Sequence, residues 1–191
     1  MRRKIIVSLL IIAFLAVAGG SFYWWQGQQS VKGLNETLPE GVRVKKSLFS
    51  NEYFVVNNID NYEFRVPIAW EGLSTIEYVA EGEEEIFNGT KVTGIGLKGL
   101  KGGATAFSID VYLIDKLDLE LIEYAREIWV FYGLDGELKG ETINGISIVK
   151  AFEEKHLMGT FVYFFENKNN LYILNNGSEE FIQEIILNGK W

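Results

Sequence analysis

The sequence predicts an α+β protein, in which an antiparallel β-sheet is covered by helices and a transmembrane helix precedes the domain. Many short segments alternate apolar and polar residues with a period of two, as strands with one buried face do. Asn144-Gly145 is typical of the two-residue turn that joins neighbouring antiparallel strands. Two amphipathic stretches near the C-terminal end and one uncharged apolar run at the N-terminus predict helices.

The N-terminal run covers residues 5–25, contains no charged side chain and is long enough to cross a bilayer as a helix. Three cationic residues precede it: Arg2, Arg3 and Lys4. Four aromatic residues close it, where a membrane-interface belt is expected: Phe22, Tyr23, Trp24 and Trp25. The positive-inside rule then predicts a single-pass protein of the cell membrane, with a cytoplasmic N-terminus and an extracytoplasmic C-terminal domain.

A cleaved signal peptide is the alternative interpretation of the same segment. Ile5–Leu15 has the length of a signal-peptide apolar region, and Ala16-Val17-Ala18 resembles a small-residue cleavage site. Cleavage after Ala18 would make the protein secreted. We favour the anchor because the aromatic residues that follow Gly20-Ser21 suit a membrane interface better than a mature N-terminus. Both interpretations predict an extracytoplasmic domain.

Residues 26–41 are polar with little periodicity and predict a tether, so the α+β domain is expected at 42–191. The first 25 residues hold three of the 18 basic side chains and none of the 26 acidic ones, so the remainder has a formal net charge of −11. This charge repels phosphate backbones and predicts no nucleic-acid partner. The chain has no cysteine, which excludes disulfides, thiolate metal sites and cysteine nucleophiles.

Strands are expected along the domain in a regular succession. The predicted strands are 42–45, 53–56, 62–66, 75–79, 92–100, 104–114, 137–143, 146–153, 159–166 and 171–174, with an acidic loop at Glu81–Glu85. One helix is predicted at Asp118–Tyr132, capped by Asp115 or Asp118 and ended by Gly133. A second begins at Ser178 and ends at Gly189.

The segment Tyr62-x-Phe64-x-Val66-Pro67-x-x-Trp70 resembles the opening strand of the PsbP/Mog1-like family. The helix, hairpins and terminal helix that follow resemble the order of elements in that family, over roughly residues 50–191. The resemblance implies an antiparallel sheet between helices, with Tyr62, Phe64, Pro67 and Trp70 in the core. It also implies a protein partner and no catalytic residues. The acidic loop and the membrane segment depart from the family pattern, so a photosynthetic role is not implied.

Other candidate chemistries are better explained as structure. Gly94–Gly99 matches GxGxxG, but the predicted strand that follows it leaves no place for the helix of a dinucleotide site. His156, the single histidine, lies beside charged residues in a predicted turn, so a catalytic triad or a histidine metal site is not expected. The acids Glu83–Glu85 and the group Asp115, Asp118 and Glu120 lack the spacing of a calcium loop.

The sequence therefore favours a membrane-anchored, non-enzymatic binding module of the cell envelope, without cofactor or metal, whose partner is a protein. An exported hydrolase that uses a pair of carboxylates in a cleft is the alternative, and a scaffold protein with only structural contacts is a third hypothesis. The hydrolase predicts a concave site with at least two acids of shifted pKa.

Overall fold

The computed structural model describes residues 2–47, 50, 52–66, 75–87, 90–101, 104–114, 119–153, 160–167, 170–175 and 178–191. The helices among these residues are α1 (Arg2–Asn35), α2 (Leu121–Phe131) and α3 (Glu179–Asn188). The strands are β1 (Val42–Lys46), β2 (Tyr53–Asn57), β3 (Tyr62–Val66), β4 (Thr75–Phe87), β5 (Thr90–Lys101), β6 (Ala104–Ile114), β7 (Leu138–Ile143), β8 (Ile146–Glu153), β9 (Thr160–Asn167) and β10 (Asn170–Asn175).

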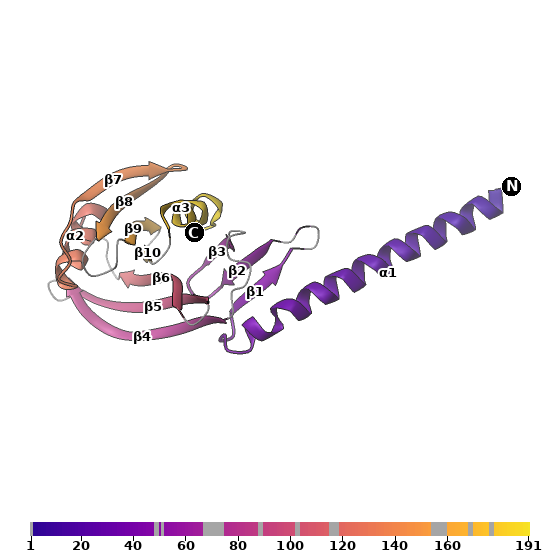
Figure 1. Ribbon diagram of the computed structural model, residues 1–191, viewed down its shortest axis with the longest axis horizontal. Helices are drawn as coiled ribbons and strands as arrows, with labels where there is room; N and C mark the ends of the chain where they lie inside the picture. The colour runs from indigo at the N-terminus through magenta and orange to yellow at the C-terminus, as the bar shows by residue number, and fades with distance from the viewer. Residues whose placement is uncertain are drawn as a thin grey trace.

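The strands form two antiparallel sheets (Figure 1). The larger has the order β4-β5-β6-β10-β9-β8-β7, and the smaller has the order β1-β2-β3. Strand β10 joins the halves of the larger sheet because it pairs with β6 on one side and β9 on the other. Figure 1 shows α1 projecting away from this domain, with its N-terminus at the end opposite to α2.

Helix α2 covers one face of the seven-stranded sheet. Its apolar side, with Ile128 2% and Trp129 4% exposed, packs on Val162, Phe164 and Ile173 of β9 and β10. These strand residues alternate with Tyr163, Phe165 and Tyr172, which point to the opposite face. Successive side chains of β9 and β10 point to opposite faces, and because both sets are apolar, the sheet has an apolar surface on each side.

The opposite face is covered by α3 together with the three-stranded sheet. The buried residues of α3 are Phe181, Ile182, Ile185 and Ile186. They join a single core with Phe64 of β3 and Phe107 and Ile109 of β6. The larger sheet therefore lies between two layers, as expected for an α+β protein with an antiparallel sheet covered by helices.

Most predicted elements are present with shifts of one or two residues, but the chain forms two sheets where one was expected. The predicted acidic loop at Glu81–Glu85 is also wrong, because these residues belong to β4 and pair with β5 across a register shift between Ala80 and Glu83. Strand β4 lies at an edge of its sheet. Acidic residues are tolerated in an edge strand, where charge also discourages pairing with other chains.

The predicted tether at residues 26–41 differs from the structure, because α1 continues through the membrane segment to Asn35. Val31 is 1% exposed and belongs to the domain core, and Leu34 packs against the same cluster. Residues three apart on a helix share one side, so these two apolar side chains of a polar stretch both face the domain.

Helix α2 begins later than predicted. Glu120 precedes its first turn and exchanges capping contacts with Glu123, the reciprocal arrangement of a capping box. The predicted caps Asp115 and Asp118 lie outside the described residues. Gly133 follows the helix at φ +65, where glycine is unstrained, so the predicted end is confirmed.

Candidate functional site

The N-terminal part of α1 exposes apolar side chains to its surroundings. Leu10 is 65% and Phe14 73% exposed. The segment Ile6–Gln29 is long and apolar enough to cross a membrane, and none of it is buried in the protein. A signal sequence has the same character, so this helix has the length and composition of a membrane anchor or of a signal sequence.

The predicted interface residues all lie on this helix. Their exposed fractions are 59% for Phe22, 51% for Tyr23, 49% for Trp24 and 53% for Trp25. The rings of Phe22 and Trp25 lie 6.1 Å apart, as neighbours on successive turns do. Arg2, Arg3 and Lys4 occupy the first turn of α1, at the end remote from the domain.

The C-terminal end of α1 is joined to β1 by hydrogen bonds. The Val44 amide donates to Asn35 Oδ1 over 2.6 Å, and Asn35 Nδ2 donates to the Val44 carbonyl over 3.0 Å. The Asn35 side chain thus satisfies both polar groups of a strand residue, as a neighbouring strand would. Thr37 Oγ1 adds a bond to the Ile76 carbonyl of β4 over 3.3 Å.

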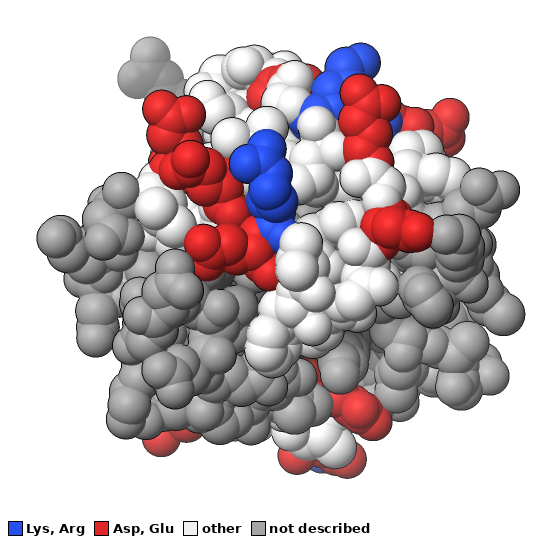
Figure 2. All heavy atoms as spheres, turned by 90° about the vertical axis from the view of Figure 1, so that its left-hand side faces the viewer, with Lys and Arg blue, Asp and Glu red and all other residues white. Residues whose placement is uncertain are grey.

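The opposite end of the molecule contains α2, and its last turn is unusually apolar for a surface. Val130 is 69%, Phe131 52% and Tyr132 48% exposed. Exposed Glu120 and Glu123 precede them on the same element. Figure 2 shows the face at this end, where acidic side chains gather beside uncharged surface.

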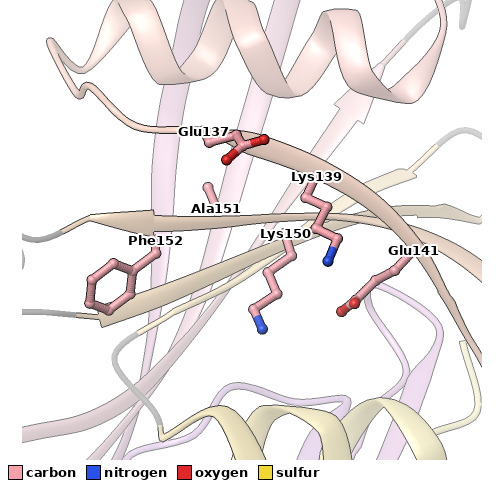
Figure 3. A pocket seen from close by; sticks show the side chains of 6 residues that line it. All are labelled: Glu137, Lys139, Glu141, Lys150, Ala151 and Phe152. Atoms are coloured by element: carbon pink, nitrogen blue, oxygen red, sulfur yellow. The ribbon is translucent and has the colours of Figure 1, made fainter.

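A groove of about 330 Å³ lies on the β7–β8 hairpin, on the face from which side chains extend toward α3 (Figure 3). Its lining residues are Glu137, Lys139, Glu141, Lys150, Ala151 and Phe152. Figure 3 shows the Lys139, Glu141 and Lys150 side chains extending from the hairpin toward α3. The groove therefore combines carboxylates, ammonium groups and one exposed ring.

One side of the groove is held in place by α3. Lys150 Nζ contacts the Glu179 carboxylate and lies 4.4 Å from the ring centre of Phe161. Tyr163 also donates to Glu179 over 3.4 Å, and burial raises the pKa of its hydroxyl. The Glu179 carboxylate and the Phe161 ring thus fix the position of the Lys150 side chain.

Glu141 differs from these groups. Its Oε1 atom is buried and has no hydrogen-bond partner within the described part of the chain. A buried carboxylate oxygen without a donor is unfavourable, so a donor supplied by a bound molecule would be favoured.

The groove lies beside a sheet edge, because β7 is the last strand of the larger sheet and pairs only with β8 among the described strands. Asn144 and Gly145 have φ values of +50 and +80, which form the predicted two-residue turn. In such a hairpin Ile143 and Ile146 exchange backbone hydrogen bonds, and the residues of β7 then bond to β8 at every second position. Gly140 falls between two bonded positions, so its N–H and C=O point away from β8. An extended peptide can pair with groups of this kind.

A second hollow, of about 410 Å³, lies between the β8–β9 region and the C-terminal residues. Trp191 forms part of its wall and packs its ring 4.8 Å from Phe165 and 5.3 Å from Tyr172. Lys190 pairs with Glu63 of β3 through two backbone hydrogen bonds. Trp191 therefore closes the core from this side.

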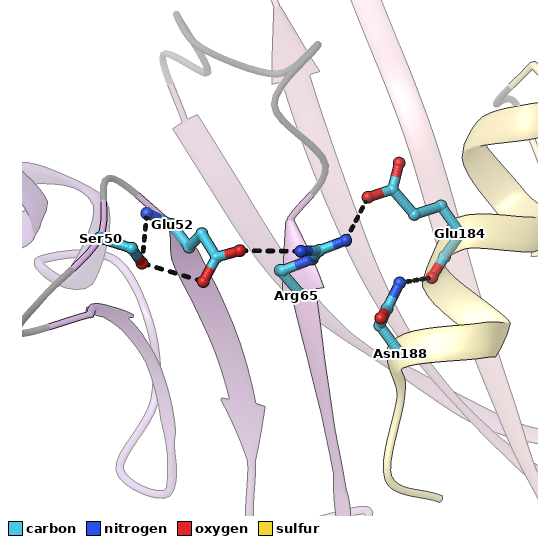
Figure 4. A network of polar contacts seen from close by, with 5 residues as sticks. All are labelled: Ser50, Glu52, Arg65, Glu184 and Asn188. Carbon is cyan, nitrogen blue, oxygen red and sulfur yellow. Dashed lines mark hydrogen bonds and ion pairs between the residues drawn. The ribbon is translucent and has the colours of Figure 1, made fainter.

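An ionic network connects three elements (Figure 4). Arg65 of β3 donates to Glu52 over 2.8 Å and to Glu184 of α3 over 2.7 Å. Ser50 donates to the other Glu52 oxygen over 2.9 Å. The hydrogen bonds from Arg65 and Ser50 lower the Glu52 pKa, and Glu52 in turn raises the pKa of Arg65. All three charges are paired, which indicates a structural role.

Two described carboxyl groups have a shifted pKa, and they lie in different surroundings. Burial raises the pKa of Asp60, which is 1% exposed, whereas Glu52 has a lowered pKa in the ionic network. Neither residue lines either hollow. The pair of shifted acids that a carboxylate hydrolase needs is thus not found among the described residues, where no group of acids and histidines suited to a metal ion occurs either.

The residues that carry the family resemblance are divided by the structure. Tyr62 is 3% and Phe64 1% exposed, so both lie in the core of the domain. Pro67 and Trp70 lie outside the described residues, as does His156. Residues 94–99 lie in β5 and are followed by β6, so their backbone has no helix that could receive a pyrophosphate.

The groove beside β7 was missed by the sequence analysis. Its signal is the alternation of charge in Glu137, Lys139 and Glu141 on one strand face, but the position of α3 opposite them is not visible in a linear pattern. The chain matches no family model, no curated protein and no solved structure.

Proposed function

We propose that the chain is a membrane-anchored, extracytoplasmic, non-enzymatic module of the cell envelope that binds a protein partner. The observation that carries this proposal is the groove on the β7–β8 hairpin. It offers an open strand edge, charges of both signs and a buried Glu141 oxygen without a partner among the described residues. A partner segment in extended conformation would pair with β7 and supply a donor to Glu141.

The arrangement of the molecule supports this function. Helix α1 leaves the domain on the side away from α2, so the domain would be held at the membrane with α2 directed outward (Figure 1). The exposed ring of Phe152, which is 42% exposed, adds apolar contact area beside the charges. Aromatic residues of this kind contribute strongly to protein interfaces.

The family resemblance belongs to the same proposal. A PsbP/Mog1-like domain is expected to contain an antiparallel sheet between helices and to bind a protein. The arrangement of α2 and α3 on opposite faces of the larger sheet supports this assignment. Tyr62 and Phe64, which carry part of the resemblance, are buried as that family pattern implies.

Site-specific crosslinking in the native host tests the binding function. We expect a photoreactive residue at position 139 to give one discrete adduct, whereas the same residue at the exposed position 126, on the opposite face of the sheet, gives none. Recovery of identical adducts from both positions, or of no adduct from position 139, would contradict the proposal.

Gly140 provides the matched control for strand pairing. Nothing lies within 4 Å of a Cβ atom added there, so Gly140→Ala should retain the adduct. Gly140→Pro removes the outward N–H without removing a bond to β8, and we expect it to lower adduct yield at least about tenfold, a loss of about 1.4 kcal/mol. Equal yields from both variants would exclude pairing along β7.

The membrane topology has a separate test. A reporter fused after Trp191 should be active only outside the cytoplasm, and the chain should resist alkaline extraction from membranes. Activity confined to the cytoplasm would overturn the proposed location. A soluble mature chain that begins at Gly19 would instead show that α1 is a cleaved signal sequence.

A further inference from the structure

Basic side chains are concentrated near the membrane end of this acidic protein. Residues 26–51 contain four basic and two acidic side chains, whereas residues 52–191 contain 11 basic and 24 acidic ones. The four basic residues are Lys32, Arg43, Lys45 and Lys46, and we call them the basic patch. The charge is thus asymmetric along the sequence, with the excess of basic residues confined to the end of α1 and to β1.

The contacts of β1 place this patch relative to the membrane segment. Val44 is bonded to Asn35, and Lys46 Cδ lies 3.3 Å from the position of a Cβ atom on Gly27. Strand β1 therefore runs back along α1 toward its N-terminal half. Gly27 follows Trp25 by two residues, which is about 3 Å along the helix axis.

The length of the membrane segment gives the level of Lys46. Ile6–Gln29 contains 24 residues and is about 36 Å long, whereas a hydrocarbon core is about 30 Å thick. The last turn of this segment therefore extends into the headgroup layer. Lys46 lies against that turn, and Lys45 precedes it on β1 with its side chain on the other face of the strand. With α1 in a bilayer, both residues would lie near the level of the lipid phosphates.

The patch is also electrostatically available. None of its four residues forms an ion pair with the part of the chain that the structure describes, whereas Arg65, Lys150 and Lys190 each contact a carboxylate. Lys46 Nζ lies 5.7 Å from the ring centre of Tyr53, a contact that leaves its hydrogen-bond donors free for an anion.

We propose that the basic patch binds the headgroups of anionic phospholipids and thereby fixes the orientation of the domain on the membrane. This inference rests on the proposed role of α1 as an anchor. Lys45 and Lys46 contact the phosphates directly, while Lys32 and Arg43 add electrostatic attraction at longer range. The strongly acidic remainder of the domain is repelled from the same surface, so the two effects favour one orientation.

Amine acylation of the full chain in lipid nanodiscs tests the proposal. Discs contain either phosphatidylcholine alone or phosphatidylcholine mixed with phosphatidylglycerol, and mass spectrometry follows each lysine separately. We expect Lys45 and Lys46 to react about fivefold more slowly in the anionic discs, which corresponds to about 1 kcal/mol per lysine. High salt should abolish the difference because it screens the charges. Exposed Lys139 and Lys190 serve as internal controls and should react equally in both discs.

A double variant and its matched control complete the test. The wild-type domain and Lys139→Gln should show a higher Tm in anionic discs than in neutral discs, whereas Lys45→Gln/Lys46→Gln should lose this shift. Equal acylation of Lys45 and Lys46 in both discs, or equal protection of every lysine, would overturn the proposal. Failure of the anchor is distinguishable, because the chain would then not be incorporated into either disc.

Discussion

Asp60 is the residue whose surroundings are most unfavourable to its ordinary charge. It lies in the turn between β2 and β3, is 1% exposed, and its Oδ1 atom has no hydrogen-bond partner in the described residues. Asn57 Nδ2 donates to the other oxygen, but burial has the larger effect and raises the Asp60 pKa. The nearby Tyr78 has its pKa raised to about 12, first by burial and then by Asp60. The turn thus buries the carboxyl group of Asp60.

Asp60→Asn should stabilise the protein near neutral pH. A carboxyl group with a raised folded pKa favours the folded state below the ordinary value of 3.8, and this contribution is lost as pH rises through the folded pKa. The amide keeps an acceptor for Asn57 and carries no charge. We expect a gain of about 1 kcal/mol at pH 7, or about 2–4 °C in Tm, that disappears at pH 3.5 or below.

The control for this prediction is Asp60→Ala, which leaves the Asn57 amide without its acceptor. It should cost about 1–3 kcal/mol at pH 3.5 and about 1 kcal/mol less at pH 7, where it also removes the buried charge. Thermal unfolding followed by circular dichroism measures both variants. If Asp60→Asn were destabilising at pH 7 and this loss disappeared in acid, the charged form of Asp60 would be the one that the fold favours.

Helix α3 is the element that connects the two sheets. Its apolar side fills the core, while Glu184 on its polar side binds Arg65 of β3. The pair is partly exposed, with 31% of the Arg65 and 39% of the Glu184 side chain accessible. The apolar contacts therefore supply most of the attachment, and the ion pair fixes its direction.

A double-mutant cycle with Arg65→Ala and Glu184→Ala should give a coupling free energy of about 0.2–1 kcal/mol. Denaturant unfolding at low and high salt measures it, and the coupling should fall at high salt. The neighbouring bond between Arg65 and Glu52 has its own pH dependence: because the pKa of Glu52 is lowered, this bond stabilises the fold above pH 4.5 and is lost as pH falls through the folded pKa. A coupling that salt leaves unchanged would contradict this account.

Trp191 completes the attachment of the segment after α3. Its ring lies 5.7 Å from Tyr62 and 4.8 Å from Phe165, in addition to the backbone pairing of Lys190 with Glu63. Trp191→Ala should cost about 3 kcal/mol in denaturant unfolding, because it leaves a space among aromatic rings. Leu187→Ala, at a position 49% exposed on α3, should cost less than about 0.5 kcal/mol. Similar losses in the two variants would show that Trp191 is not part of the core.

At the scale of the whole molecule, α1 joins its apolar N-terminal segment to the domain as one continuous helix. No break in the helix separates Trp25 from Val31, which is buried in the domain. The apolar contacts of Val31 and the two hydrogen bonds of Asn35 then hold the helix end on β1. With α1 as the membrane anchor that we propose, the domain is expected to keep one distance and one orientation to the membrane surface.

Asn35→Ala should loosen this connection. It leaves the Val44 N–H and C=O without their side-chain partner, so amide hydrogen exchange in residues 28–38 should become at least about tenfold faster. The unfolding of the seven-stranded sheet should change little. Gly33→Ala is the control, since nothing lies within 4 Å of the added Cβ and alanine favours a helix, so exchange there should slow. Unchanged exchange in Asn35→Ala would show that Asn35 does not hold the junction.

Local signals in the sequence determined much of this protein. The apolar run at residues 5–25, the alternation in 104–114, the turn at Asn144-Gly145 and the cap at Ser178 each depend on neighbours within one turn or one hairpin. Such short-range preferences are readable without knowledge of the fold. They were sufficient for the class of antiparallel sheet and helices with an apolar N-terminal helix.

Only the tertiary structure decided how these elements meet. The division into two sheets, the pairing of β10 with β6, the attachment of α1 to β1 and the contact of α3 with the groove on the β7–β8 hairpin all join residues far apart in the chain. Lys46 shows the reason: its neighbour Gly27 is unrelated to it by any periodicity, and the contact depends on how α1 packs on the domain, where Val31 is buried. Contacts of this kind follow from packing of the whole core, in which every side chain restricts the others, and no local pattern contains them.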